Sequence, residues 1–228
     1  MIHMDTINRL NEKINNIGCQ MVKCTKNCAG IAKPGENDII PMCLYLEDTK
    51  DNSTTGTIIV GINPGNATKK EREYYYKHGH NYENVVNYWK KYVQCKHQYY
   101  KKLRAFVNGL GFNGHILWTE LVKCANDKNE QPPLQTFRTC CSEYLNEEIK
   151  AVPGDWPIIG AGRKAYEVLT FLYPKRTIIG VPHPTGSWGY FEKLFKGKSV
   201  KPEMLKPELL FDKCKCDETQ WATKDGYK

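Results

Sequence analysis

The sequence lacks any apolar run long enough to span a membrane, and its first residues lack the apolar segment of a secretory signal peptide. Internal repeats and low-complexity segments are also missing, which argues against architectures built from repeated units. These absences predict an intracellular protein without a membrane partner, located in the cytoplasm or with the nucleoid or nucleus.

The length and composition predict one globular domain. The 228 residues amount to about one and a half typical domain lengths, and 40% of them are hydrophobic. We expect a monomer with a single domain over residues 1–228, carrying an N-terminal helix and cysteine segment (1–56) and a basic tail (197–228). The net charge of +8 is compatible with a nucleic-acid partner, although a solvated lysine-rich surface gives the same charge.

Strand-like and helix-like segments alternate along the chain after a polar loop. The strand-like runs are 57–62, 115–122, 156–160 and 176–181, and the helix-like runs are 68–77, 83–94, 97–110, 135–151, 162–172 and 188–196. Strands that alternate with helices predict a mostly parallel sheet between helical layers, which is a three-layer α/β sandwich.

An amphipathic helix is predicted before this alternation. Asp5 is a candidate cap, and Gly18 is expected to stop the helix. Its apolar face consists of Ile7, Leu10, Ile14 and Ile17. An irregular segment that contains several cysteines is expected from Cys19 to Cys43.

Two stiff turns directly follow two of the predicted strands. Residues 61–65 are Gly-Ile-Asn-Pro-Gly, and residues 181–186 are Val-Pro-His-Pro-Thr-Gly. Proline fixes φ and glycine tolerates positive φ, so each turn can bring one polar group close to a ligand. We therefore expect Asn63 and His183 to face a shared crevice at one edge of the sheet.

These turns resemble the two active-site motifs of the uracil-DNA glycosylase superfamily. The first resembles the asparagine version of the mismatch-specific and single-strand-selective branches, and the second has Thr185 in the serine place of a His-Pro-Ser motif. Residues 116–124, Ile-Leu-Trp-Thr-Glu-Leu-Val-Lys-Cys, are similar to a segment of the iron–sulfur families 4 and 5. The resemblance implies an enzyme of this fold that hydrolyses the N-glycosidic bond of uracil, or of a related damaged base, in DNA.

The resemblance also implies a [4Fe-4S] cluster. Its ligands would be Cys24, Cys28, Cys124 and Cys140. Four thiolates also suit tetrahedral zinc, which is the alternative metal and would fit an unrelated zinc-stabilised α/β protein. The first pair departs from the family pattern, because three residues separate its cysteines where the family usually has two. Other thiols remain possible ligands; these are Cys19, Cys43, Cys95, Cys141, Cys214 and Cys216.

Asn63 and His183 have the chemistry that such a reaction needs. Cleavage develops positive charge on the sugar and negative charge on the departing base. Asn63 can orient a water, and His183 can donate a hydrogen bond to a base oxygen. The alternatives are a turn asparagine that satisfies its own backbone and an ordinary surface histidine.

The target base must leave the stack and enter a pocket. The resemblance places Gly61 and Ile62 at this pocket and one of Tyr74, Tyr75 and Tyr76 against the base, Tyr75 and Tyr76 being preferred. The alternative for these tyrosines is core packing. The candidates for DNA contact are Arg163, Pro184, Thr185, Gly186, Ser187 and Trp188.

Glu120 departs from the family pattern, because it occupies the place of the base-recognising asparagine. An amide matches the O4 acceptor and N3 donor of uracil, whereas an ionised glutamate presents only acceptors. Glu120 could accept from an exocyclic amine, be protonated in a dry pocket, or point away and pair with a lysine. The alternative function is therefore a non-catalytic nucleic-acid-binding module with the same fold.

Overall fold

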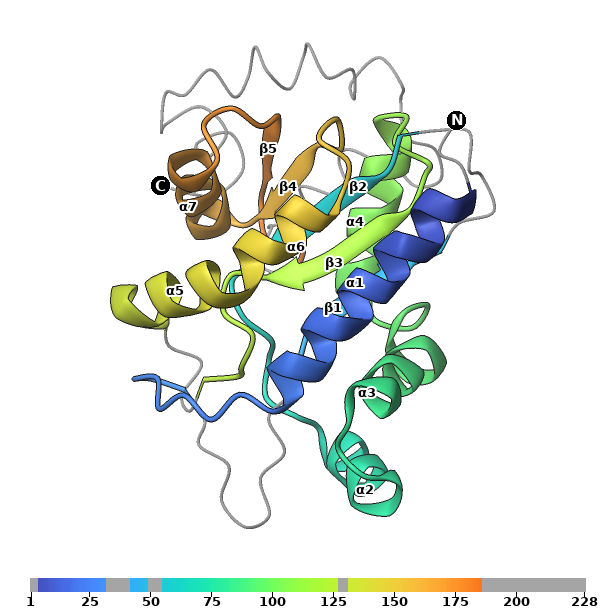
Figure 1. Cartoon of the computed structure of the whole chain (residues 1–228), viewed down its shortest axis with the longest axis vertical. Coiled ribbons are helices and arrows are strands. Elements are labelled where there is room, and N and C mark those ends of the chain that lie inside the picture. The colour runs from blue at the N-terminus through green and yellow to red at the C-terminus, as the bar shows by residue number, and fades with distance from the viewer. Residues whose placement is uncertain (1–3, 32–41, 49–54, 127–130, 186–228) are drawn as a thin grey trace.

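The computed structural model describes residues 4–31, 42–48, 55–126 and 131–185. Five strands form one sheet in the order β1-β3-β2-β4-β5 (Figure 1). They are β1 (Leu44–Glu47), β2 (Thr57–Gly61), β3 (Ile116–Glu120), β4 (Ile158–Ala161) and β5 (Ile178–Val181). Strands β3, β2, β4 and β5 run parallel, and β1 lies antiparallel along β3 at the edge.

The described residues also form α-helices, most of which lie between the strands in the sequence. They are α1 (Met4–Val22), α2 (Lys69–His78), α3 (Tyr82–Tyr88), α4 (Gln98–Gly109), α5 (Leu134–Cys140), α6 (Asn146–Ala151) and α7 (Arg163–Leu172). π-Helical turns over Trp89–Val93 and Cys141–Leu145 follow α3 and join α5 to α6. In the described part of the chain, no helix is both long and apolar enough to cross a membrane.

The two faces of the sheet are covered by different helices. Successive strand residues point to opposite faces. Thr119 of β3 donates to Glu148 of α6, whereas the ring of its neighbour Trp118 contacts Tyr100 of α4 with 4.9 Å between ring centroids. α1 contacts α6, so these two helices form one layer and α4 belongs to the other (Figure 1). The predicted α/β sandwich is therefore confirmed.

Burial on both faces explains why these strands are recognisable in the sequence. Every residue of β2, β3, β4 and β5 is buried. Parallel strands covered by helices on both sides consist of nearly continuous apolar runs, such as Thr-Ile-Ile-Val-Gly over 57–61. The four predicted strands accordingly appear within two residues of their expected starts and ends.

The edge strand β1 was not expected. It is only four residues long, Leu-Tyr-Leu-Glu, which is too short to show a clear pattern before the polar loop that follows it. The Glu47 carboxylate is buried: Arg104 donates to both of its oxygens at 2.6 Å, and Trp118 donates from Nε1 at 2.7 Å. These partners lie more than fifty residues away in the sequence, where no local pattern indicates them.

Two expectations about the first helix are wrong. α1 begins at Met4, so Asp5 lies inside the helix, and it continues through Gly18 to Val22. Gly18 serves close packing instead, because a Cβ there would come within 2.2 Å of the Tyr82 ring in α3. The predicted helix over 188–196 and the tail over 197–228 lie outside the described residues.

Candidate active site

The two motif turns meet at one cavity. Asn63 follows the end of β2, and His183 follows the end of β5. Because these strands are parallel within one sheet, their carboxyl ends lie at the same edge. Both side chains line a cavity of about 830 Å³, together with Glu120 from the end of β3. The predicted shared crevice is thus present in the geometry.

The first turn is held in place by the backbone that follows β3. Leu121 N–H donates to the carbonyl oxygen of Gly61 at 3.0 Å, and Val122 N–H donates to that of Ile62 at 2.9 Å. The Asn63 amide donates from Nδ2 to the Pro64 carbonyl oxygen at 3.0 Å. This bond orients the side chain and leaves Oδ1 as an acceptor, which is the atom that can hold a water.

His183 is held by its own turn as a neutral imidazole. The backbone N–H of Thr185 lies 3.4 Å from Nδ1, and the Thr185 hydroxyl lies 2.9 Å from the same atom. A backbone N–H can only donate, so Nδ1 is the acceptor and Nε2 carries the proton. Burial lowers the pKa of His183 from its ordinary value, which favours this neutral form.

Glu120 lies inside the same cavity. It is 6% exposed, and among the described residues its Oε2 has no hydrogen-bond partner. A Cβ on Gly61 would come within 2.0 Å of Oε2, so the absence of a side chain at Gly61 makes room for the carboxyl group. Burial raises the pKa of Glu120 to about 8, while Lys123 and Cys43 oppose that rise.

The tyrosines proposed to stack on the base are not at the cavity. Tyr75 is buried against Tyr88 and His80, and Tyr76 is exposed, and neither lines the cavity. The stretch from α3 to the start of α4 supplies the aromatic lining instead. Its members are Tyr88, Trp89, Tyr92, Tyr99 and Tyr100. The expectation depended on distance from the first turn, whereas the density of aromatic residues over 88–100 was the better signal.

The predicted DNA contacts are only partly described. Arg163 begins α7 and donates from Nε to Glu167 at 2.8 Å, so its guanidinium is engaged within its own helix. Thr185 lines the cavity, and the Pro184 carbonyl oxygen accepts from Lys102 at 3.3 Å. Gly186, Ser187 and Trp188 lie outside the described residues.

Lysines gather around one aromatic residue of the cavity. The Nζ atoms of Lys70, Lys91 and Lys96 lie 4.2, 5.2 and 5.5 Å from the centroid of the Tyr92 ring. Both Tyr92 and Lys96 line the cavity. Ammonium groups close to an aromatic face combine phosphate attraction with a surface on which a base can stack. Tyr92, Lys91 and Lys96 were not among the predicted DNA contacts.

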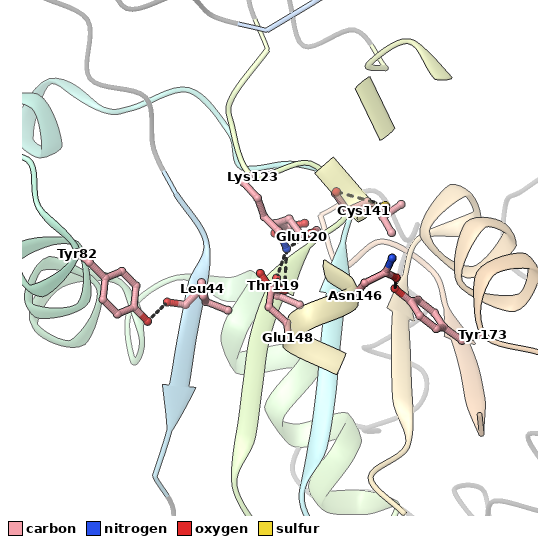
Figure 2. Close-up of polar contacts among 10 residues, drawn as sticks. Leu44, Tyr82, Thr119, Glu120, Lys123, Cys141, Asn146, Glu148 and Tyr173 are labelled. Carbon is pink, nitrogen blue, oxygen red and sulfur yellow. Dashed lines mark hydrogen bonds and ion pairs between the residues drawn. The ribbon is translucent and has the colours of Figure 1, made fainter. Parts of the chain in front are cut away.

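A buried ion pair lies behind Glu120, on the α6 face of the sheet (Figure 2). Lys123 donates from Nζ to Glu148 at 2.8 Å, to the Thr119 hydroxyl at 2.6 Å and to the backbone carbonyl oxygen of Glu120. Lys123 and Glu148 are 2% and 0% exposed in their side chains. The lysine therefore pairs with Glu148, and the Glu120 carboxyl group is left facing the cavity.

The four predicted thiol ligands line a second cavity. Its volume is about 360 Å³. It is lined by Cys24, Cys28, Cys124 and Cys140, with Lys123 and Tyr144 among the other lining residues. Thr136 donates to the Ala29 carbonyl oxygen at 2.8 Å, and Gly30 adopts a positive φ of 68° where a Cβ would approach Pro133 within 2.8 Å. These contacts hold the N-terminal cysteine segment against α5.

The alternative thiols are placed less well for a metal. Cys19 and Cys95 are exposed, Cys43 lines the first cavity, and Cys141 donates to the Leu121 carbonyl oxygen at 3.6 Å. Cys214 and Cys216 lie outside the described residues. The structure thus brings together the four thiols that the resemblance singled out.

Four thiols are a donor set that suits a [4Fe-4S] cluster or a tetrahedral zinc ion. Within the described ranges, no three His, Cys, Asp or Glu side chains are arranged to hold one metal ion. A [4Fe-4S] cluster separates its ligands more widely, because each thiolate binds a different iron. Burial, with the neighbouring Cys140, Cys24 and Cys28, raises the pKa of Cys124 to about 12. These thiols would therefore ionise only with a compensating cation between them.

The fold and the first cavity define an α/β sandwich with a polar site at the carboxyl edge of its sheet. Residues 49–205 match the family described as the uracil DNA glycosylase superfamily, over well more than half of the chain. The chain belongs to this superfamily. Membership indicates DNA glycosylase activity in general, with DNA as the partner. No curated protein matches the chain.

Proposed function

We propose that this protein is a DNA glycosylase that hydrolyses the N-glycosidic bond of uracil or a related deaminated or damaged base. The observation that carries the proposal is that Asn63 and His183, 120 positions apart in the chain, line the same cavity. Family membership supports the reaction class. The segment 116–124 suggests the iron–sulfur families 4 and 5 as the nearest branches.

The proposed mechanism uses the two turns on opposite sides of the bond. The flipped nucleotide enters the cavity, and Asn63 accepts a hydrogen bond from a water through Oδ1 and aims it at the anomeric carbon. An amide is a poor base, so its contribution is orientation. His183 donates from Nε2 to a base oxygen as negative charge develops there. A neutral imidazole performs this role without a proton transfer.

The cavity wall suggests how DNA is held. Tyr92 with Lys70 and Lys96 would receive a base and its phosphate next to the target nucleotide. Pro184, Thr185, Gly186, Ser187, Trp188 and Arg163 remain proposed DNA contacts. This arrangement leaves both single-stranded and double-stranded DNA as candidate substrates.

We also propose that Cys24, Cys28, Cys124 and Cys140 hold a [4Fe-4S] cluster, with zinc as the alternative metal. The support is the cavity that these thiols line together and the similarity of residues 116–124 to the iron–sulfur families. When bound, the cluster would act as a covalent tie between the N-terminal segment and the loop before α5. Base excision itself would need no electron transfer, because hydrolysis leaves all oxidation states unchanged.

The test is an excision assay with the purified full chain. Single-stranded and double-stranded oligonucleotides carrying uracil, hypoxanthine, xanthine or 5-hydroxymethyluracil would be incubated with the protein and then cleaved with alkali at abasic sites. Strand cleavage at one of these bases, strongly reduced in both Asn63→Ala and His183→Ala, is the expected result. Tight DNA binding without excision of any base would favour the non-catalytic binding module, for which the departure at Glu120 is the main support.

A further inference from the structure

The Glu120 carboxyl group is a buried polar group that the mechanism above does not use. Its side chain comes from the end of β3, the neighbour of β2, and lines the same cavity as the two motif turns. It is almost completely buried, and Oε2 has no hydrogen-bond partner among the described residues. A buried polar atom without a partner costs stability, so its retention at the wall of a binding cavity indicates a ligand as partner.

A chain of hydrogen bonds fixes the role of each carboxyl oxygen. The Cys43 sulfur lies 3.9 Å from the Tyr100 hydroxyl and also forms a side-chain hydrogen bond with Glu120. Burial and the neighbouring Glu120 raise the pKa of the Cys43 thiol well above its ordinary value, so the thiol keeps its one hydrogen. The Tyr100 hydrogen bond acts to lower the pKa of Cys43, and the Cys43 hydrogen bond acts to lower that of Glu120. We therefore take the Tyr100 hydroxyl as donor to the Cys43 sulfur, and the Cys43 thiol as donor to one oxygen of Glu120.

The remaining oxygen, Oε2, lies against Gly61 at the wall of the cavity that Glu120 lines. An oxygen that accepts from a thiol acts as the carbonyl oxygen of a carboxylic acid, so the acid hydrogen belongs on the other oxygen. We propose that Glu120 is a specificity-determining carboxylic acid, which donates its Oε2 hydrogen to the exocyclic carbonyl oxygen of a base held in the cavity. The site would therefore select keto bases such as uracil and hypoxanthine over amino bases such as cytosine and adenine. This inference rests on the proposed glycosylase function.

The surroundings of Glu120 favour its neutral form. The titratable and charged groups that face it or its partners are Cys43, Tyr99, Tyr100, Lys123, Glu148 and His183. Burial also raises the pKa values of Tyr99 and Tyr100, and His183 is neutral. The one cation of this group, Lys123, has its ammonium group on Glu148 and Thr119. A pKa of about 8 for Glu120 keeps the acid hydrogen in place at neutral pH.

The two protonation states discriminate differently between bases. The acid form donates to the O4 of uracil, but its donor would face the amino group of cytosine, which is also a donor. The ionised form would oppose O4 with a second acceptor and lose the preference. A buried polar mismatch of this kind changes relative affinity by about tenfold to a hundredfold.

The test measures preference separately from excision. Single-stranded oligonucleotides would carry one 2′-fluoro-2′-deoxyuridine or one 2′-fluoro-2′-deoxycytidine, in which the fluorine blocks cleavage, and affinity would be followed by fluorescence anisotropy. For the wild type, the uracil-over-cytosine preference should fall about tenfold between about pH 6.5 and about pH 9, one unit above the pKa of Glu120. The amide of Glu120→Gln donates at every pH, so the uracil-over-cytosine preference of this variant should stay the same at both pH values. Glu147→Gln, an exposed carboxylate on α6, is the matched control and should follow the wild type.

The outcomes separate this inference from the function on which it rests. The inference is overturned if the wild type excises uracil but its uracil-over-cytosine preference does not change with pH. It is also overturned if the preference of Glu120→Gln changes with pH as that of the wild type does. Both outcomes leave the glycosylase proposal standing. Loss of both excision and base preference in Glu120→Gln would mean that Glu120 takes part in the reaction, which also overturns the inference. Absence of both excision and preferential binding in the wild type would remove the proposed function and this inference together.

Discussion

Met42 lines both of the described cavities, yet the other residues that line them differ in chemistry. The larger one collects hydrogen-bonding groups from the carboxyl ends of three strands and aromatic residues from α3 and α4. The smaller one collects four thiols from the segment after α1, the segment after β3, and α5. The larger cavity presents hydrogen-bonding and aromatic groups to a ligand, and the smaller one brings together thiols from separate chain segments.

This contrast shows how position in the fold determines what a site can do. Strand ends are rigid, so a turn that follows them can hold a reacting group within tenths of an ångström. The cysteine segments after α1 and β3 are irregular, and the proposed metal centre would cross-link them to α5. We therefore expect changes in the larger cavity to alter excision without altering stability, and changes in the smaller cavity to do the reverse.

The largest effect is expected at Lys123, which lines the smaller cavity. Lys123→Met removes the ammonium group from a buried ion pair and leaves Glu148 uncompensated at 0% exposure. The free energy of unfolding should fall by about 3–5 kcal/mol. Urea denaturation monitored by circular dichroism would measure it. The double variant Lys123→Met/Glu148→Leu should recover most of the loss; a double variant no more stable than the single one would contradict this account of the pair.

His183→Ala should lower the single-turnover rate of excision by about a hundredfold to a thousandfold, since it removes a donor to the developing anion. The thermal unfolding temperature and the metal content should stay close to those of the wild type. His97→Ala is a suitable control, because His97 also lines the cavity but caps α4 through the Tyr99 N–H. Equal losses in the two variants would show that His183 acts through packing.

Asn63→Ala should lower the same rate by about a hundredfold, because the water loses the group that aims it. Asn63→Asp, which keeps both the size and an acceptor oxygen, should recover part of the rate. If Asn63→Ala and His183→Ala both retained the wild-type rate on the best substrate, the active site assigned to the two turns would be wrong.

Cys28→Ser should remove the metal and lower the unfolding temperature by about 5 °C or more, while the folded fraction excises within about tenfold of the wild-type rate. Cys95→Ser, a change at an exposed thiol elsewhere, should alter neither property. Iron, zinc and acid-labile sulfide would be measured in anaerobically purified protein. A wild-type preparation with neither iron nor zinc would remove the proposed metal centre.

The smallest effect is expected in the fall of the excision rate at acid pH. The pKa of His183 is lowered from 6.5, so the neutral imidazole persists at neutral pH and is lost only as the pH falls below 6.5. Protonation of Nδ1 would break its contact with the Thr185 N–H and loosen the turn. The rate–pH profile should therefore decline below pH 6.5 in the wild type and in Asn63→Ala, with no such decline in His183→Ala.

Four parallel strands, the two turns at their ends and the set of four cysteines could all be predicted from the sequence. Continuous apolar runs, proline–glycine turns and cysteine spacing are properties of short segments, so they are visible before folding. The sheet then necessarily brings Asn63 and His183 to one edge, because all its parallel strands end there.

The tertiary structure alone decided which side chains surround those two residues. It buried Glu47 under Arg104, placed Tyr92 at the cavity in preference to Tyr75, and joined Glu120 to Cys43. Each of these contacts connects segments far apart in the chain, and no local pattern specifies the partner. The protonation state of Glu120 follows from burial by such distant segments, because desolvation depends on everything that surrounds a group and not on its neighbours in sequence.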